Sequence, residues 1–444
     1  MRKFFYILIA FFACILLGCE TKTTSTSSTS SVAKLSTFSF AQNDSIPGLA
    51  QAVFTIEERL DTGFVYNKDS MLYGTRIDSV IPKFTFAATP GAAFLTFPDT
   101  TVVLTGNDTL DFNKRPVYLT IRSSDKTVTK VYEIDARVHQ ADPDLFVWKR
   151  LCPAVYPSDD SEQRVLEFND DFLMIVSNGF ELSTYYSTDG ANWLSLGEPT
   201  GLPAGTKVRQ IISDGSTLYY GQDSTIYTST DALTWTSTPV AYNVRTMLFY
   251  WNDQIWSLVD NSGKNELALF EDDALTLTGL QPEGEFPVSD FAAVTFTSPS
   301  ERERAMIIGG FAENGKSLNT RWNFEYSTHI KDNNGYRIQE FSIDRPAFTS
   351  LTGISVISYN DRLMLFGGVN AEMNYFGRDI FVSEDEGLNW EVADTAKNQL
   401  PEVYTARQKQ TAIVRDNYIY LFGGQDSKAT YSDVYRGKLN SIDW

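Results

Sequence analysis

The sequence is short of cysteine and histidine. Its cysteines are Cys14, Cys19 and Cys152, and its histidines are His139 and His329. The first two cysteines belong to an N-terminal apolar segment, so no internal disulfide framework is expected, and Cys152 is expected to be a small buried hydrophobe. Two histidines nearly exclude a histidine-based metal cluster. We therefore expect no metal site, and nothing in the sequence indicates a cofactor.

Motifs of common catalytic and phosphate-binding sites are also missing. The chain has no histidine pair at ligand spacing, no Gly-x-Ser-x-Gly and no Walker sequence, so metal hydrolysis, serine chemistry and nucleotide binding lack their signatures. Positive charge is scarce as well, because 37 Lys and Arg face 56 Asp and Glu, for a net charge of −19. A surface of that sign repels nucleic acid, and we expect no nucleic-acid partner.

The N-terminal apolar run is too short to span a membrane. It covers residues 4–18 after Arg2 and Lys3, which fits a signal peptide and falls short of the roughly 20 residues of a spanning helix. The run ends in Leu-Leu-Gly-Cys and resembles the bacterial lipobox, which implies cleavage after residue 18 and lipid attachment at Cys19. An ordinary signal peptide that happens to contain cysteine is the alternative.

Three segments follow the predicted signal peptide of residues 1–18. Residues 19–32 are rich in Ser and Thr and predict a flexible tether. Short β-rich runs separated by turns over residues 33–141 predict an immunoglobulin-like β-sandwich. This region resembles the immunoglobulin-like spacer modules of Bacteroides-type surface lipoproteins. A proline-containing junction then leads to residues 144–444.

Residues 144–444 contain six copies of one pattern, in which two apolar runs flank a polar turn. Five of the turns carry Asn-Asp, Asp-Gly or Asp-Asn pairs, which favour hairpins. Trp193 and Trp235 lie 42 residues apart, close to the period of propeller blades. The copies predict a six-bladed β-propeller, and residues 144–149 predict an outer strand that closes the ring. The expected fold class is all-β, with the sandwich first and a kelch-like propeller second.

Two kinds of repeat marker are present, and both are expected to be structural. Glycine pairs end three of the second strands, at Gly309-Gly310, Gly367-Gly368 and Gly423-Gly424; with the closing Trp444 they resemble the kelch repeat. Residues 383–390, with Asp385, Gly387 and Trp390, resemble the Asp-box hairpin. Shortened relatives of this motif end in Trp193 and Trp235. Taken whole, the chain resembles lipoproteins of unknown function from Bacteroides-type bacteria.

The ligand is expected to bind on the propeller face that carries the long loops. Arginines and aromatic residues on these loops are anchors for sugars and carboxylates, although scattered solvated residues are the plainer interpretation. The candidates are Arg209, Arg245, Arg321, Trp322, Arg345, Tyr375, Phe376, Arg378, Tyr404 and Arg407.

The expected role is a non-catalytic recognition or scaffolding platform. It is held at the outer membrane by its lipid, faces the periplasm or the cell surface, and binds a protein or a glycan. The alternative is a glycan-active hydrolase of sialidase-like type. The Phe-Arg-Ile-Pro entry motif of that family is absent here, so we expect no catalytic residue, and enzymatic activity remains the weaker hypothesis.

Overall fold

The computed structural model describes residues 29–444 except 47, 158–160, 299, 343–349 and 441–444. The predicted signal peptide, Cys19, most of the predicted tether, Arg345 and Trp444 lie outside the described residues. The chain divides into two compact units between Ala141 and Asp142. Across the residues described, no helix combines the length and the apolar character that crossing a bilayer requires.

The N-terminal unit is a β-sandwich. Its strands are β1 Leu35–Phe40, β2 Phe54–Glu57, β3 Thr62–Asn67, β4 Pro82–Phe86, β5 Ala92–Thr96, β6 Thr101–Val103, β7 Val117–Arg122 and β8 Thr129–Asp135. One sheet has the order β2-β3-β8-β7-β5-β6, and β1 pairs with β4 in the other. The order β8-β7-β5-β6 corresponds to strands G, F, C and C′ of an immunoglobulin sheet. The predicted sandwich is therefore confirmed, with β3 and β5 as strands that the sequence did not predict.

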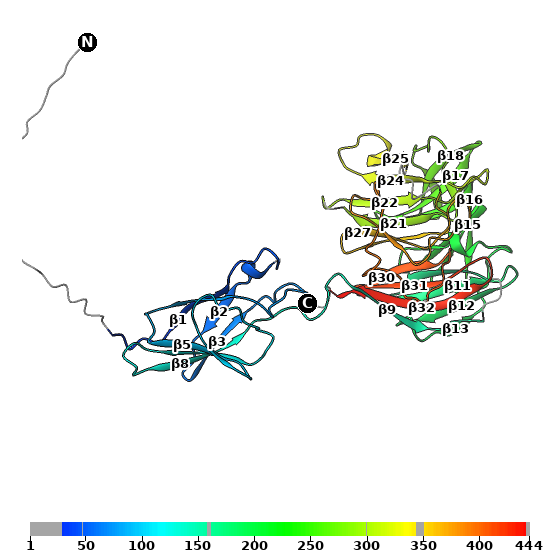
Figure 1. The fold of residues 1–444 in the computed structure, drawn as a ribbon. Helices are drawn as coiled ribbons and strands as arrows, with labels where there is room; N and C mark the ends of the chain where they lie inside the picture. The colour runs from blue at the N-terminus through cyan, green and yellow to red at the C-terminus, as the bar shows by residue number, and fades with distance from the viewer. Residues whose placement is uncertain (1–28, 47, 158–160, 299, 343–349, 441–444) are drawn as a thin grey trace, which may run out of the picture. The chain divides into compact units, whose positions relative to one another are not determined.

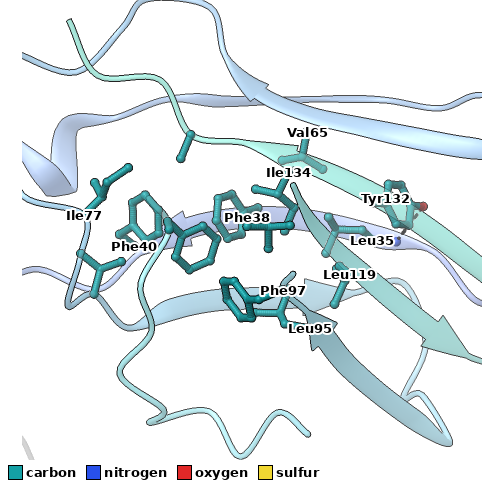
Figure 2. Close-up of a cluster of buried hydrophobic side chains, with 14 of the residues drawn as sticks. Leu35, Phe38, Phe40, Val65, Ile77, Leu95, Phe97, Leu119, Tyr132 and Ile134 are labelled. Carbon is teal, nitrogen blue, oxygen red and sulfur yellow. Dashed lines mark hydrogen bonds between the residues drawn. The ribbon is translucent and has the colours of Figure 1, made fainter. Parts of the chain in front are cut away.

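Aromatic side chains fill the interior of this sandwich. Phe38 and Phe40 from β1 meet Phe112 at ring-centroid distances of 6.0 and 5.1 Å. Figure 2 shows Phe38 and Phe40 between residues of the larger sheet, including Leu95 and Leu119. Alternation of buried and half-buried residues along β3 and β7 follows from the two-residue period of a strand, with one face on the core.

The second unit is a β-propeller with six blades in its described residues. The inner strands, in blade order, are β10 Glu162–Phe168, β14 Ile212–Ser213, β16 Thr236–Trp251, β21 Ala292–Thr297, β26 Ser355–Tyr359 and β30 Thr411–Arg415. Only the second part of β16 is the inner strand of the third blade. Each inner strand contacts the next in this series, and β30 contacts β10. The six strands therefore surround one channel.

The remaining strands extend the blades outward, except for Pro287–Ser289 and Phe311–Ala312, which pair with each other in a separate two-stranded sheet. They are β9 Phe146–Cys152, β11 Asp171–Ser177, β12 Leu182–Ser187, β13 Leu194–Gly197, β15 Leu218–Ser229, β17 Gln254–Asn261, β18 Lys264–Glu271, β19 Ala274–Leu277, β20 Pro287–Ser289, β22 Glu303–Ile308, β23 Phe311–Ala312, β24 Thr320–Tyr326, β25 Tyr336–Ser342, β27 Arg362–Phe366, β28 Ile380–Ser383, β29 Glu391–Val392, β31 Tyr418–Gln425 and β32 Thr430–Leu439. Four blades are separate four-stranded sheets: β10 to β13, β21-β22-β24-β25, β26 to β29, and β30-β31-β32-β9.

Strand β9 closes the ring as the sequence predicted. It pairs antiparallel with β32, from the Cys152–Val434 pair at one end to the Phe146–Leu439 pair at the other. Figure 1 shows the two strands side by side. The first strand of the unit thus completes the last blade, which protects the edge of β32. Cys152 at the end of β9 is buried with a free thiol, as expected.

The second and third blades differ from the predicted separate sheets. Strands β14 to β19 form one six-stranded sheet, because β16 pairs with β15 through its first half and with β17 through its second half. Register shifts mark the passage from one blade to the next within β16. The linker between these two blades is therefore a continuous strand and not a loop.

Hairpin turns between first and second strands have the predicted geometry. Both central residues have positive φ at 169–170, 252–253, 360–361 and 416–417, with values between 50° and 64°. Type I′ turns require this conformation, which Asn and Asp tolerate better than other residues. Short polar pairs thus determine where the first two strands of these blades meet.

One buried cluster lies between each pair of neighbouring blades. The indoles of Trp148, Trp193, Trp235 and Trp390 belong to or pack against four of these six clusters. Trp193 meets Phe422 edge to face at 5.9 Å, which joins the first blade to the last. Between the second and third blades Leu277 occupies the corresponding place. The tryptophans therefore have the structural role that the sequence indicated.

The loop Ser187–Trp193 has its own hydrogen-bonding pattern. Asp189 accepts backbone N–H bonds from Ala191 and Asn192, both at 2.8 Å, and Trp193 Nε1 donates to the Gly190 carbonyl at 3.0 Å. The Asn192 backbone bond is the main cause that lowers the pKa of Asp189 to about 2. The loop around Asp385 repeats this pattern with Asn389, Gly387 and Trp390.

Asp189→Ala is expected to lower propeller stability by about 1 kcal/mol at pH 7, as loss of a capping side chain does. Because the folded pKa is depressed, the Asp189 contribution is present above the unfolded value near 3.8 and is lost as pH falls toward about 2. Urea unfolding of both proteins at pH 7 and pH 2.5 measures this. The difference in free energy of unfolding between the unmodified chain and Asp189→Ala should shrink at low pH. A difference that does not depend on pH, or an equal loss of stability in the neighbouring exposed Thr188→Ala, contradicts the stabilising role of Asp189.

Candidate functional site

A cavity of about 310 Å³ opens at one end of the propeller channel. Its lining combines charged residues with an apolar wall, and consists of Glu162, Arg164, Lys207, Arg209, Gln210, Ile212, Met247, Leu248, Ser289, Asp290, Phe291 and Ala293. These residues come from the inner strands of four blades and from the segments that precede them. The cavity therefore lies at the end where the loops between blades enter, which is the face that the sequence predicted for binding.

Local structure explains why charged side chains gather here. Glu162 and Arg164 are two residues apart in β10, so they point to the same side of the strand, into the channel. Arg209 lies in the short 3-10 helix Val208–Gln210 that leads into β14. Asp290 lies between β20 and β21. The first, second and fourth blades thus contribute charge just where their inner strands begin.

Four of the charged residues form a connected network. Arg209 Nε lies 3.3 Å from Asp290 Oδ1, and Arg209 Nη1 donates to the Lys409 carbonyl at 2.8 Å. Lys409 Nζ lies 3.7 Å from Asp290 Oδ2 and 3.2 Å from Glu162 Oε1. The network holds Arg209 in a fixed position, with only 9% of its side chain exposed.

Arg164 stands apart from this network. Its Nε is enclosed and has no hydrogen-bond partner in the described part of the chain, and the charge that acts on it is a second cation, Arg209. Burial, with a smaller effect of Arg209, lowers the pKa of Arg164 to about 10, so the guanidinium stays protonated at neutral pH. The Arg164 side chain as a whole is half-buried, and a partly buried charge without a counter-charge favours a ligand that neutralises it.

We call Glu162, Arg164, Lys207, Arg209, Asp290 and Lys409 the mouth cluster. Its four cations and two carboxylates leave a net charge of +2 on a chain whose net charge is −19. Guanidinium forks bind carboxylate and phosphate oxygens in a bidentate manner. The chemistry of the mouth cluster is therefore that of an oxyanion-binding site.

Among the ten predicted ligand-binding residues, Arg209 lies in the cavity. Arg245, the other arginine near the start of an inner strand, is paired with Asp260 at 3.0 Å and with Glu313. Its guanidinium is thus neutralised by one carboxylate of its own blade and one of the next blade. The cavity lining does not include Arg245.

Four further candidates are buried in the propeller. Arg321 is 2% exposed; it donates to the Glu386 carbonyl and lies over the Phe341 ring at 4.5 Å. Trp322 packs in the cluster between the third and fourth blades. Arg407 is 1% exposed and pairs with Asp433 at 2.5 Å, next to the buried Tyr404. These side chains hold blades together and are not part of the mouth cluster.

The last candidates lie in the loop that follows Gly367-Gly368. Phe376 packs edge to face on Phe381 at 5.5 Å, and Arg378 Nη1 donates to the Leu400 carbonyl at 3.3 Å. Tyr375 is half-buried, and this burial raises its pKa. Arg345 belongs to the residues that the structure does not describe.

Sequence reasoning missed five members of the mouth cluster: Glu162, Arg164, Lys207, Asp290 and Lys409. A signal was available, because Arg164 precedes the apolar run of a first strand in a sequence with more acidic than basic residues. Arg164 lies on the same face of this inner strand as Leu166 and Phe168, which pack toward the second blade, and its side chain lines the cavity where that face reaches the channel. Within the described residues no group of three or more His, Cys, Asp or Glu is placed to hold a metal ion.

The second unit is thus a β-propeller with a charged cavity at the end of its channel. The chain belongs to the DUF6242 family: the model described as the DUF6242 beta propeller domain matches residues 142–444, and the model of the DUF6242 N-terminal domain, a domain of unknown function, matches residues 19–136. No curated protein is similar enough to count as a match. A solved structure titled "Structure of YjhT" is similar at 14% identity and a TM-score of 0.47, covering 64% of this chain and 96% of that one.

Proposed function

We propose that the chain is a non-catalytic recognition platform whose ligand binds at the mouth cluster. The observation that carries this proposal is the half-buried Arg164, whose enclosed Nε has no hydrogen-bond partner in the described chain and which lines a cavity of about 310 Å³. Natural proteins seldom keep an uncompensated buried charge unless function requires it. The ligand is a protein or a glycan of the cell envelope.

We propose further that a lipid on Cys19 holds the platform at the outer membrane, on its periplasmic or outer face. The Leu-Leu-Gly-Cys sequence and the following Ser/Thr-rich stretch support this. Partition into the detergent phase, compared between the chain and Cys19→Ser, tests the anchor. The glycine pairs, all at positive φ, and the Asp189 and Asp385 loops support an origin from kelch and Asp-box repeats.

The expected result for the recognition role comes from capture with envelope extract and from a glycan array. The chain should retain a partner that the double variant Arg164→Met, Arg209→Met loses, because both guanidinium groups of the cavity are removed. Arg415→Met, which alters a guanidinium outside the cavity lining, is the matched control and should bind as the unmodified chain does. If the double variant captured the same partner as the unmodified chain, the mouth cluster would not be the binding site.

A glycan-active hydrolase is the second candidate, and one distance favours it. Glu162 and Asp290 both contact Lys409 Nζ, at 3.2 and 3.7 Å, so the two contacting oxygens are at most about 7 Å apart, a separation found in glycosidase carboxyl pairs. However, a glycosidase acid must carry a proton, whereas both groups are ion-paired to cations. Hydrolysis of acidic aryl glycosides that disappears in Glu162→Gln would establish the hydrolase.

A further inference from the structure

The mouth cluster also indicates the class of ligand. The cavity volume of about 310 Å³ lies at the lower end of the range for small-molecule sites, roughly 300 to 1,000 Å³. A protein interface buries about 800 Å² on each partner, far more than this cavity offers. The enclosed part of the ligand is therefore about the size of one sugar residue.

Charge balance indicates a single negative charge. Arg209 is matched by Asp290, and Lys409 is matched by Glu162 and Asp290. Lys207 is exposed and solvated. Arg164 is the enclosed cation of the cluster that lacks a counter-charge among the described residues. One monoanion neutralises Arg164, whereas a dianion would leave the second charge facing Asp290 and Glu162.

Part of the cavity wall is apolar. Met247, Leu248 and Phe291 line the same cavity as Arg164 and Arg209. Small-molecule sites combine such walls with a few polar groups that orient the ligand. Arg164 and Arg209 also line the narrower part of the channel below, so a group bound between them sits at the inner end of the cavity and the rest of the ligand lies against the wall.

From these observations we infer that the mouth cavity binds the carboxylate of an acidic sugar residue between Arg164 and Arg209, with the sugar ring against the half-buried Phe291. This inference rests on the proposed recognition role and names its ligand class. The same carboxylate chemistry is supplied by a free acidic monosaccharide or by an acidic residue of a larger glycan.

Three probes that share one ring test the inference: glucuronate, glucose and glucose 6-phosphate, titrated calorimetrically into the full chain. Glucuronate should bind, glucose should bind at least about tenfold more weakly because it lacks the charge-assisted hydrogen bonds, and glucose 6-phosphate should bind more weakly than glucuronate. Equal binding of glucose, or tighter binding of the phosphate, overturns the inference. The inference is also overturned if the chain binds no free glucuronate and a glycan array shows no preference for uronate-terminated glycans.

Arg164→Met separates this role from a structural one. Removal of a half-buried charge that lacks a counter-charge should leave the melting temperature of the free chain unchanged or raise it, while it weakens glucuronate binding about tenfold or more. Arg415→Met should leave glucuronate binding unchanged. A lower melting temperature with unchanged binding would make Arg164 a structural residue and contradict the inference. If the probes fail but the double variant still loses its envelope partner, the recognition role stands and only the ligand class is wrong.

Discussion

Arg407→Ala is expected to destabilise the propeller by about 3 to 5 kcal/mol, the range for removing one partner of a buried ion pair. Arg407 Nη1 lies 2.5 Å from Asp433 Oδ1, and both side chains are at most 5% exposed. The guanidinium also donates to the carbonyls of Thr405 and Gly423 and lies 3.9 Å from the Tyr431 ring centroid. Truncation leaves the buried Asp433 carboxyl group with the partly exposed Arg150 as its remaining ion-pair partner at 3.4 Å.

Urea unfolding followed by tryptophan fluorescence measures this effect in the propeller alone, because all 8 tryptophans follow residue 141. Arg302→Ala, which removes a guanidinium that is 60% exposed, should cost less than about 1 kcal/mol. The double variant Arg407→Met, Asp433→Asn should be more stable than Arg407→Ala, because it leaves no buried unpaired charge and Arg150 is 44% exposed. A cost below about 1 kcal/mol for Arg407→Ala would show that the pair contributes little.

Gly309→Ala is expected to cost about 3 kcal/mol or more. Gly309 has φ +65°, and a Cβ built on it would lie 2.1 Å from the Leu351 carbonyl oxygen. Left-handed backbone costs an L-residue about 1 to 2 kcal/mol, and overpacking adds roughly 1 to 3 kcal/mol. Since the obstacle is backbone of the next blade, to which Gly310 N–H donates at 2.6 Å, neither side can move away without parting the blades.

The matched control for this substitution is Gly315→Ala in the same blade. Gly315 has φ +80° but no heavy atom within 4 Å of the added Cβ, so it carries the conformational cost and not the clash. Gly309→Ala should therefore unfold at a clearly lower urea concentration than Gly315→Ala. Equal midpoints for the two variants would mean that close approach between blades does not explain the glycine pair.

Local sequence signals predicted most of the propeller because its blades are built from local contacts. Turn pairs such as Asn252-Asp253 require positive φ and so mark the hairpins directly. The glycine pairs marked where blades crowd, and Trp193 and Trp390 marked the interfaces between them. The merger of the second and third blades through β16 could not be predicted, because it depends on pairing with two different neighbours and not on any turn residue.

The candidate site was predicted less well than the fold. Loop residues such as Arg321 and Arg407 have the chemistry of ligand anchors, but their direction depends on tertiary packing, which turned them into the protein interior. Arg209 was found because it precedes an inner strand. Arg164 lies within one, where the period of a strand aims it at the channel. Position relative to the inner strand therefore carried more information than residue type.

The most direct test of whether Arg164 binds a ligand carboxylate is a crystal structure of the full chain grown with glucuronate. The account predicts a carboxylate between the Arg164 and Arg209 guanidinium groups, with the network of Arg209, Asp290, Lys409 and Glu162 unchanged. An ion pair between Arg164 and a carboxylate of the chain itself, with glucuronate absent from the cavity, would contradict it.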